Sequence, residues 1–397
     1  MTTHPLQPVA LESQAVNFQA LPPLSLYIHI PWCVRKCPYC DFNSHEPRGA
    51  LPEHEYVVAL IRDMETALPL VWGRKVYTVF FGGGTPSLLS GESVAEILRN
   101  VRMLLPLALD AEITLEANPG TVEAGRFAAY REAGVNRLSM GIQSFSDTHL
   151  QALGRIHTAD EAKRAIEIAQ QHFDNLNFDL MYALPKQTPD EALQDVQTAL
   201  SFAPQHLSCY HLALEPNTLF HHNPPSLPDD DASSDMQQRI EEVLAAAGYQ
   251  HYETSAFALP KQRARHNLNY WQFGDYLGIG AGAHSKLSFP GKIIRQARYK
   301  QPQAYMQQVA KGEPVQTEQE VSRDELGFEF MMNALRLNEG FDSALFGERT
   351  SLSLLGLQRE LDEAGRRGLL LRDYRHIAPT RLGQRFLNDL LEIFLRR

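Results

Sequence analysis

The chain has 397 residues, of which 44% are hydrophobic and 21% are charged. This composition is typical of a globular protein with a full core, and roughly 150 residues per domain suggests two to three domains. The formal net charge of −10 argues against a dedicated nucleic-acid binder, because affinity for phosphates needs a basic face. The four cysteines are too few for a secreted disulfide scaffold.

Residues 1–23 contain several prolines among polar residues. They lack the basic and apolar regions of a signal peptide, so we expect a flexible N-terminal tail. No apolar run approaches the ~18 residues that a transmembrane helix needs. The expected location is therefore the cytoplasm, a reducing compartment in which clustered thiols indicate metal or redox chemistry rather than disulfides.

Residues 24–250 alternate between short apolar runs and segments of helical periodicity, such as Val94–Leu104. The predicted strands are Leu24–Ile30, Val76–Phe81, Ile113–Glu116, Arg137–Ile142, Leu176–Met181 and Leu207–Leu214. Six β–α units predict an α/β fold with a parallel sheet and helical crossovers. The stretch is shorter than the ~250 residues of a closed eight-unit barrel. It therefore favours an incomplete (βα)6 TIM-like barrel, with a doubly wound sheet as the alternative.

Each predicted strand leads into polar or glycine-rich residues. The first precedes a cysteine loop and the second Gly82–Pro86, and the others end near Glu116, Gln143, Asp179 and Glu215. In parallel α/β folds, ligands bind at the C-terminal edge of the strands. One buried polar residue is more often structural, but this repetition predicts a ligand site at that edge.

After Gly248 the strand–helix rhythm weakens, and we interpret residues 251–321 as a connecting region. Residues 322–397 carry 12 basic and 12 acidic side chains. They are predicted to form a separate, winged-helix-like helical domain, from helices at Glu325–Leu335, Leu354–Ala364 and Leu382–Leu395 and short strands at Leu369–Leu371 and His376–Ile377. Neutral charge argues against DNA binding by this domain, and a packing or lid role is the alternative.

Three of the four cysteines lie in one loop as Cys33-x-x-x-Cys37-x-x-Cys40. Three thiolates can hold three corners of a cubane iron–sulfur cluster and leave the fourth iron open to another ligand. The alternative is a structural zinc site completed by His29 or His45. Zinc usually takes two separated ligand pairs, and the sequence shows no second Cys/His pair. Cys209 is expected to be a buried strand residue outside the cluster.

The segment from Tyr27 to Cys40 resembles the signature of radical S-adenosylmethionine (SAM) proteins. The motifs that follow, in order, resemble the subgroup around oxygen-independent coproporphyrinogen III oxidase: Gly82–Pro86, Glu116–Pro119, Arg137–Phe145 and Asp179–Thr188. The resemblance implies a partial (βα)6 barrel with a 4Fe–4S cluster at its C-terminal face. It also implies that SAM chelates the open iron and is cleaved by one electron to methionine and a 5′-deoxyadenosyl radical.

The resemblance places the SAM site on residues that match the family's motifs. Glycines at 83 and 84 would let the backbone approach the methionine moiety where a Cβ would obstruct it, and Arg155 would pair with a carboxylate. The implied SAM-binding set is Tyr27, Gly83, Gly84, Thr85, Glu116, Gln143, Arg155, Asp179, Ala213 and His284. The run Gly278-x-Gly280-x-Gly282 is by itself only a weak dinucleotide-binding signal.

Two features separate the branches of this family. In the oxidases the cysteine motif continues Cys-x-Cys, whereas here Cys40 is followed by Asp41 and Phe42, which argues against coproporphyrinogen oxidation. The second feature is an element that resembles the haem-binding motif of the HemW haem chaperones: His266, Asn267, Tyr270 and Trp271.

A histidine can ligate haem iron, and aromatic rings can stack on the macrocycle. Lys261, Arg263 and Arg265, just upstream, could meet the propionates. The alternative is that His266 and Asn267 cap a turn while the two aromatic residues pack in the core.

The resemblance therefore implies a cytoplasmic haem chaperone with a SAM-coordinated 4Fe–4S cluster. Such a protein would bind haem as cargo and pass it to haem-requiring acceptor proteins, such as respiratory ones at the membrane. Peripheral membrane contact and a homodimer are compatible with this function. The alternatives are an oxygen-independent coproporphyrinogen III oxidase, which decarboxylates propionates, and a zinc-dependent structural protein. Whether the protein is an enzyme is left open.

Overall fold

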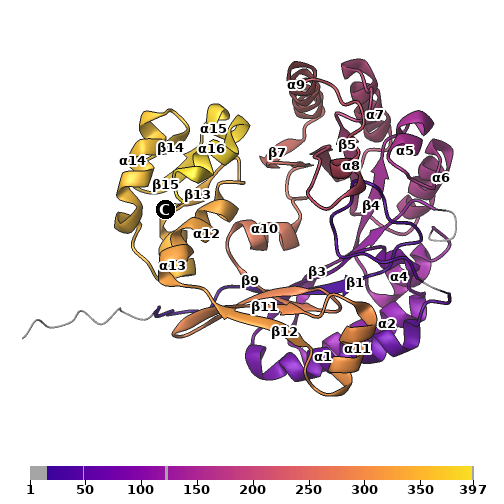
Figure 1. Cartoon of the computed structure of the whole chain (residues 1–397), viewed down its shortest axis with the longest axis horizontal. Helices are drawn as coiled ribbons and strands as arrows, with labels where there is room; N and C mark the ends of the chain where they lie inside the picture. Colours follow the sequence, from indigo (N-terminus) through magenta and orange to yellow (C-terminus); the bar gives the residue numbers. More distant parts are fainter. Residues whose placement is uncertain (1–15, 48, 121–123, 396–397) are drawn as a thin grey trace, which may run out of the picture.

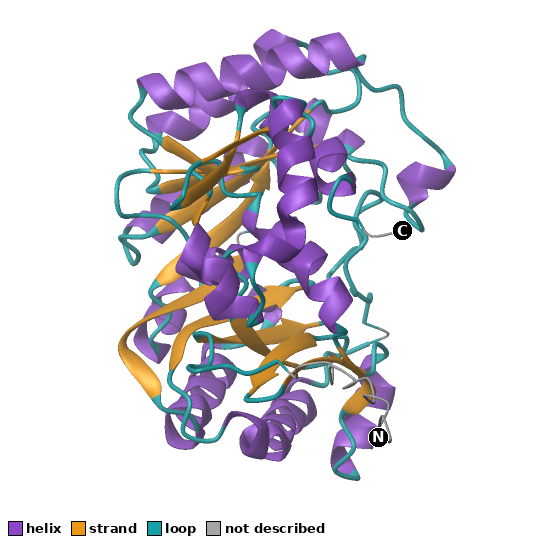
Figure 2. Ribbon diagram, turned by 90° about the vertical axis from the view of Figure 1, so that its left-hand side faces the viewer, coloured by secondary structure: helices purple, strands orange, loops and turns teal. Residues whose placement is uncertain are grey.

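A computed structural model describes residues 16–47, 49–120 and 124–395. Within these residues the chain forms a 12-stranded sheet of order β12-β11-β10-β9-β1-β2-β3-β4-β5-β6-β8-β7, and a 3-stranded sheet of order β13-β15-β14. The large sheet curves, and the crossover helices lie on its outer side (Figure 1). Turned by 90°, the molecule shows helices above and below the strands (Figure 2).

The predicted parallel half of the sheet is confirmed. Its strands are β1 (Leu24–Ile30), β2 (Val76–Gly83), β3 (Leu107–Ala117), β4 (Arg137–Gln143), β5 (Leu176–Tyr182) and β6 (His206–His211). Neighbours in this series pair in parallel. β3 starts earlier than predicted, and a register shift against β2 accommodates its extra residues. The observed sheet is open and curved (Figure 1), as expected of an incomplete barrel.

Helices connect these strands. They are α1 (Glu53–Val71), η1 (Pro86–Leu88), α2 (Gly91–Leu104), α4 (Phe127–Ala133), α5 (Asp147–Ala152), α6 (Ala159–Gln170), α7 (Pro189–Ser201), α8 (Leu219–His222) and α9 (Asp230–Ala246). α6 and α7 both begin with capping boxes, in which a threonine and a glutamate satisfy each other's free backbone N–H groups. The apolar stripe predicted on α2 is buried against the sheet.

Residues 251–321, expected to be a connecting region, instead extend the sheet at both edges. The elements are β7 (Gln250–Glu253), β8 (Ala256–Ala258), α10 (Arg265–Trp271), β9 (Asp275–Ile279), β10 (His284–Phe289), β11 (Lys292–Arg298), α11 (Pro302–Ala310) and β12 (Val315–Glu320). β9 pairs in parallel with β1, and β10 to β12 add an antiparallel meander.

The sequence pattern missed these strands because they carry buried charge. Asp275 on β9 is fully enclosed and bonds Lys286 Nζ on β10 at 3.0 Å and Arg74 Nη2 at 2.8 Å. Buried charges of this kind are stable only when paired, and the partners come from distant segments. These charged residues interrupt the apolar pattern of the strands, although Leu277 and Ile293 are also buried there.

The C-terminal unit comprises α12 (Arg323–Ala334), β13 (Phe341–Asp342), α13 (Ser343–Thr350), η2 (Leu354–Leu357), α14 (Gln358–Arg366), β14 (Leu370–Arg372), β15 (His376–Pro379), α15 (Arg381–Arg385) and α16 (Leu387–Glu392). It has its own core, in which Phe330 packs edge-on against Phe341 and Phe346. The helix expected over Leu382–Leu395 is broken at Phe386, whose φ of −114° and ψ of 49° are not helical.

Part of the expected N-terminal tail packs on this unit. Phe18 is buried in the C-terminal core and its N–H donates to the Pro290 carbonyl at 3.1 Å. Asn17 exchanges two hydrogen bonds with Ser351. This part of the segment is therefore held in place, whereas residues 1–15 lie outside the described residues.

Candidate functional site

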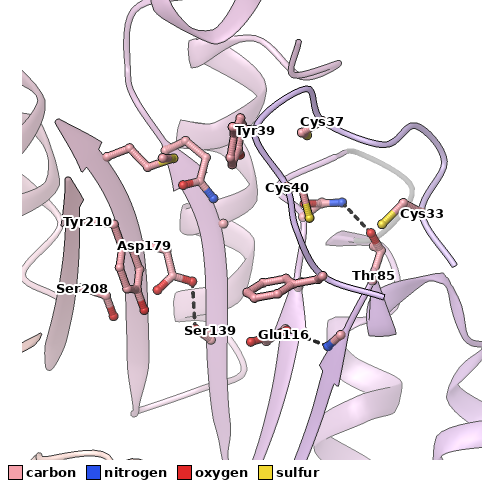
Figure 3. A pocket seen from close by; sticks show the side chains of 18 of the residues that line it. Cys33, Cys37, Tyr39, Cys40, Thr85, Glu116, Ser139, Asp179, Ser208 and Tyr210 are labelled. Carbon is pink, nitrogen blue, oxygen red and sulfur yellow. Dashed lines mark hydrogen bonds between the residues drawn. The ribbon is translucent and has the colours of Figure 1, made fainter. Parts of the chain in front are cut away.

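The three clustered cysteines lie in the loop that follows β1, above the C-terminal ends of β1 and β2 (Figure 3). Two short backbone hydrogen bonds, both of 2.7 Å, tie the start of this loop to the segment after β2. The N–H of Gly84 donates to Ile30, and the N–H of Thr85 donates to Trp32. Parallel neighbours thus place the cysteine loop beside the glycine segment.

The glycine segment is needed for this close approach. A Cβ on Gly84 would lie 2.5 Å from the Trp32 carbonyl oxygen, and one on Gly83, whose φ is +111°, would lie 2.4 Å from the His29 ring. The expectation was that these glycines make room for the methionine moiety of SAM. A side chain at either glycine would collide first with atoms of the protein itself. Both glycines are therefore needed for packing within the protein, whether or not a ligand is bound.

One of the two histidines suggested as a fourth zinc ligand, His29, is committed to other partners. Among the described residues, no group of three His, Cys, Asp or Glu side chains is gathered tightly enough to hold one metal ion. His29, the suggested fourth zinc ligand, uses one ring nitrogen on the Tyr27 hydroxyl at 3.1 Å and the other on the Asn43 carbonyl at 2.9 Å. Burial lowers the pKa of His29 to about 4, so it is neutral and committed to the fold.

Below the cysteine loop lies a cavity of about 410 Å³ inside the partial barrel. Alternate residues of each strand face it, as the pleat requires; on β4 these are Arg137, Ser139, Gly141 and Gln143. Glu116 and Asp179 point into the same space in Figure 3. The cavity brings together the three cysteines and most of the predicted SAM set, namely Gly83, Gly84, Thr85, Glu116, Gln143, Arg155, Asp179 and Ala213.

The other two residues of that set, Tyr27 and His284, line a second cavity of about 740 Å³. The two cavities have five lining residues in common: Cys40, Asp41, Phe42, Gly83 and Glu116. The predicted SAM set is therefore divided between two adjoining spaces that meet at Glu116 and the cysteine loop.

Two half-buried carboxyl groups, those of Glu116 and Asp179, set the electrostatics of the first cavity. Burial, reinforced by nearby Asp179, raises the pKa of Glu116 to about 8, and one of its oxygens accepts from the Gly83 N–H at 3.3 Å. Burial also raises the pKa of Asp179. Asp179 accepts hydrogen bonds from Ser139 at 3.1 Å and Asn177 at 2.8 Å. At neutral pH the Glu116 carboxyl is therefore largely protonated.

Arg155 is held by protein groups within the cavity wall. Its Nη2 donates to the Asn118 side-chain oxygen at 2.7 Å and to the Gly141 carbonyl at 2.8 Å, and its Nη1 lies 3.8 Å from Cys37 Sγ. This contact places a fixed positive charge beside the Cys37 thiol. One edge of the guanidinium is thus already occupied.

Helix α10, which carries the predicted haem motif, lies on the inner side of the curved sheet (Figure 1). Glu112 on β3 accepts hydrogen bonds from the backbone N–H groups of Arg265 and His266, each at 3.0 Å. The carboxylate satisfies donors that a first helical turn leaves free. Asn267 lines the first cavity and Tyr270 the second, so one short helix contributes to both spaces.

Of the remaining motif residues, His266 is buried and Trp271 is half-buried. His266 is 1% exposed and stacks on Phe80, and its Nδ1 bonds Thr78 Oγ1 at 2.7 Å. Trp271 lies under the guanidinium of Arg336, whose Cζ is 4.2 Å from the ring centre. The alternative expected His266 to cap a turn, but no side chain caps the start of α10, and the His266 ring bonds Thr78 and Tyr270 instead.

The upstream basic residues are arranged differently from the expectation. Arg263 forms a two-bond ion pair with Glu339 at 2.6 and 2.8 Å, and Arg265 reaches Asp110. Of the three suggested propionate partners, two are therefore already paired with protein acids.

Residues 27–199 match the family model of the radical SAM superfamily, and residues 321–386 match that of the HemN C-terminal domain. The chain is 52% identical to the haem chaperone HemW of Escherichia coli, over 94% of this chain and 99% of that protein. It is 48% identical to HemW of Haemophilus influenzae, with 94% and 98% coverage. The chain belongs to the HemW family of radical SAM proteins.

The solved structure of the coproporphyrinogen III oxidase HemN from Escherichia coli covers 94% of this HemW-family chain with a TM-score of 0.80 and 26% identity. Its likeness extends the shared fold through the C-terminal domain. A bovine mitochondrial protein, radical S-adenosyl methionine domain-containing protein 1, is 38% identical over 94% of the chain.

Several lining residues of this HemW-family cavity escaped the sequence reasoning: Arg137, Ser139, Asn177, Ser208 and Tyr210. Their signal was the alternation of polar residues within β4, β5 and β6. That alternation predicts an inward-facing polar surface, because successive side chains point to opposite faces of a sheet. Cys209, between two of them, is buried on the opposite face as expected.

Proposed function

We propose that this HemW-family protein binds a 4Fe–4S cluster, SAM and haem, and passes haem to acceptor proteins. The observation that carries the proposal is the position of α10. The motif residue Asn267 lines the same cavity as Cys33, Cys37 and Cys40. A cargo bound at the motif helix would thus be in reach of the space that the cluster and SAM occupy.

The residues present fit the cluster. The three thiols would hold three irons. Burial raises the pKa of the Cys33 thiol, and the adjoining Thr85 and Ser44 side chains offset part of that rise. When bound, the cluster supplies the electron for SAM cleavage. The chain's own contribution is to hold the loop by its backbone bonds, to place Arg155 beside Cys37, and to keep Glu116 beside the Gly83 N–H.

Haem ligation by His266 would require a rearrangement of α10. Both ring nitrogens are engaged in the structure, on Thr78 and Tyr270, and a nitrogen must be free to bind iron. We propose that haem binding breaks the bond to Tyr270, whose side chain borders the second cavity. After haem has passed to the acceptor, the hydrogen bond between His266 and Tyr270 would form again.

No helix among the described residues is long and apolar enough to cross a membrane. We propose that the protein acts in the cytoplasm and hands haem to respiratory acceptors while in peripheral contact with the membrane. We also propose that it can form a homodimer.

The deciding experiment is anaerobic cluster reconstitution followed by haem titration, with and without SAM. Wild-type protein is expected to bind haem, and a variant with His266→Ala, Tyr270→Ala and Trp271→Ala is expected to bind it much more weakly. Equal binding by the two proteins would refute the motif assignment. Thermal midpoints and iron content of both proteins show whether the variant remains folded.

The likeness to HemN favours a second function, the oxidative decarboxylation of coproporphyrinogen III. Against it stands Phe42, which occupies the place of a further cysteine and lines both cavities. A reduced, reconstituted protein supplied with SAM and coproporphyrinogen tests this alternative. Formation of protoporphyrinogen together with 5′-deoxyadenosine would establish it, and absence of both products would exclude it.

A further inference from the structure

Arg137 is a buried cation at the floor of the first cavity. It begins β4, six positions before Gln143, and is 3% exposed. Its side chain makes no hydrogen bond or ion pair with any residue that the structure describes, and its Nε is fully enclosed. A guanidinium in such a place is ordinarily paired, because an unpaired charge away from water is costly.

Glu116 and Asp179 attract the guanidinium electrostatically, which lowers the pKa of each carboxyl against the larger effect of burial, but neither forms a hydrogen bond or an ion pair with Arg137. Asp179 accepts hydrogen bonds on both carboxylate oxygens, from Ser139 and Asn177. Glu116 accepts from the Gly83 backbone, and with a pKa raised to about 8 by burial and by Asp179 it is largely neutral at pH 7. Neither lies within 4 Å of the guanidinium, so its donors remain free toward the cavity.

Asn267, from the motif helix, lines the same cavity, and its side chain makes no hydrogen bond within the described part of the chain. The first turn of its helix is already satisfied by Glu112. The cavity floor thus presents a free guanidinium and a free amide, which together offer several N–H donors and one positive charge.

We propose that Arg137, assisted by Asn267, binds a carboxylate of the ligand that enters this cavity. The planar fork of a guanidinium matches a carboxylate with two parallel hydrogen bonds. The inference rests on the proposed function, because both expected ligands carry this group: haem has two propionates, and SAM has an α-carboxylate.

The test compares ligands that differ only in the carboxylate. Haem is compared with haem dimethyl ester, and SAM with decarboxylated SAM, in anaerobic titrations of reconstituted wild-type protein, Arg137→Gln and Arg137→Lys. Arg62→Gln is the control, because Arg62 is an exposed arginine on α1, away from the residues that line either cavity. Wild-type protein should prefer one carboxylate ligand by roughly tenfold or more, as expected of a charge-assisted bidentate contact.

In Arg137→Gln this preference should disappear, in Arg137→Lys it should shrink, and in Arg62→Gln it should persist. The pair of ligands that loses its preference identifies the source, a propionate or the SAM carboxylate. The inference is overturned if wild-type protein does not discriminate, or if Arg137→Gln weakens acid and ester equally, as a purely structural role would. If Arg137→Gln does not fold, Arg137→Lys and the wild-type preference decide. A wild-type protein that binds no haem instead refutes the proposed function.

Discussion

The Nε2 of His266 shares a hydrogen bond of 3.0 Å with the hydroxyl of Tyr270, one helical turn further along α10. Thr78 on β2 holds the other ring nitrogen. The imidazole is thereby fixed between the sheet and a residue that borders the second cavity. This clamp explains how a motif suited to iron ligation is stable inside the protein, since each buried polar atom of the ring has a partner.

Burial of this ring makes the stability of the protein depend on pH. Burial, together with the positive charge of Arg137, lowers the pKa of His266 from 6.5 to about 3. Below pH 6.5 the unfolded chain takes up a proton that the folded chain does not, so this contribution is complete above pH 6.5. It is lost as the pH falls, by up to about 1.4 kcal/mol per pH unit.

We therefore expect His266→Gln to show a flatter dependence of the denaturation midpoint on pH between 5 and 6.5 than wild-type protein. His222→Gln, which changes an exposed histidine on α8, serves as the control and should follow the wild-type curve. Parallel curves for wild type and His266→Gln would show that this imidazole does not titrate as described.

Single substitutions Cys33→Ala, Cys37→Ala and Cys40→Ala should each remove most of the iron and sulfide bound after anaerobic reconstitution. A cubane that loses one of its protein ligands has too few thiolates to anchor it. Cys209→Ala, at the buried thiol on β6, should retain the wild-type iron content. Zinc in place of iron in wild-type protein, or full iron content in a loop variant, would contradict the cluster assignment.

Gly84→Ala should weaken both the fold and the cluster. The new Cβ would meet the Trp32 carbonyl at 2.5 Å, and separating the two segments would strain the backbone bonds that hold the cysteine loop. We expect a loss of about 1–3 kcal/mol in stability and reduced iron occupancy. In Gly365→Ala, where α14 leaves 4 Å of open space, stability should be unchanged or higher by up to about 1 kcal/mol. Thermal midpoints measure the stability of the two variants, and iron analysis measures their cluster occupancy. Equal stability and equal iron content in Gly84→Ala and Gly365→Ala would contradict the packing role of Gly84.

The C-terminal unit is tied to the motif helix through Arg336. Its guanidinium covers the Trp271 ring and its Nη2 lies 3.3 Å from the buried carboxylate of Glu253. Arg336→Ala would leave that carboxylate without its cation and should cost about 1–3 kcal/mol. In the double variant with Glu253→Gln the added cost of losing the arginine should be smaller. Denaturation of the four proteins of this cycle measures the coupling, and strictly additive losses would rule it out.

Local patterns were enough to predict β1 to its observed ends at Leu24 and Ile30, and the parallel half of the sheet with it. The strands of residues 251–321 were not predictable in the same way. Lys286 and Asp275 read as surface residues until the fold brings Arg74 and the two strands together. The spacing of apolar residues does not predict strands whose buried positions include charged residues held in ion pairs.

The sequence by itself determined the cysteine spacing, the order of the family motifs and the strand–helix alternation, because each depends on residues close together in the chain. Only the tertiary structure decided that Thr78 holds a histidine 188 residues away, and that Asn267 and the cysteines line one cavity. It also decided that Arg137 lies there without a hydrogen bond or ion pair to any described residue. Burial and pairing depend on atoms brought together from distant segments, and these determine which polar groups are satisfied by the fold and which remain free for a ligand.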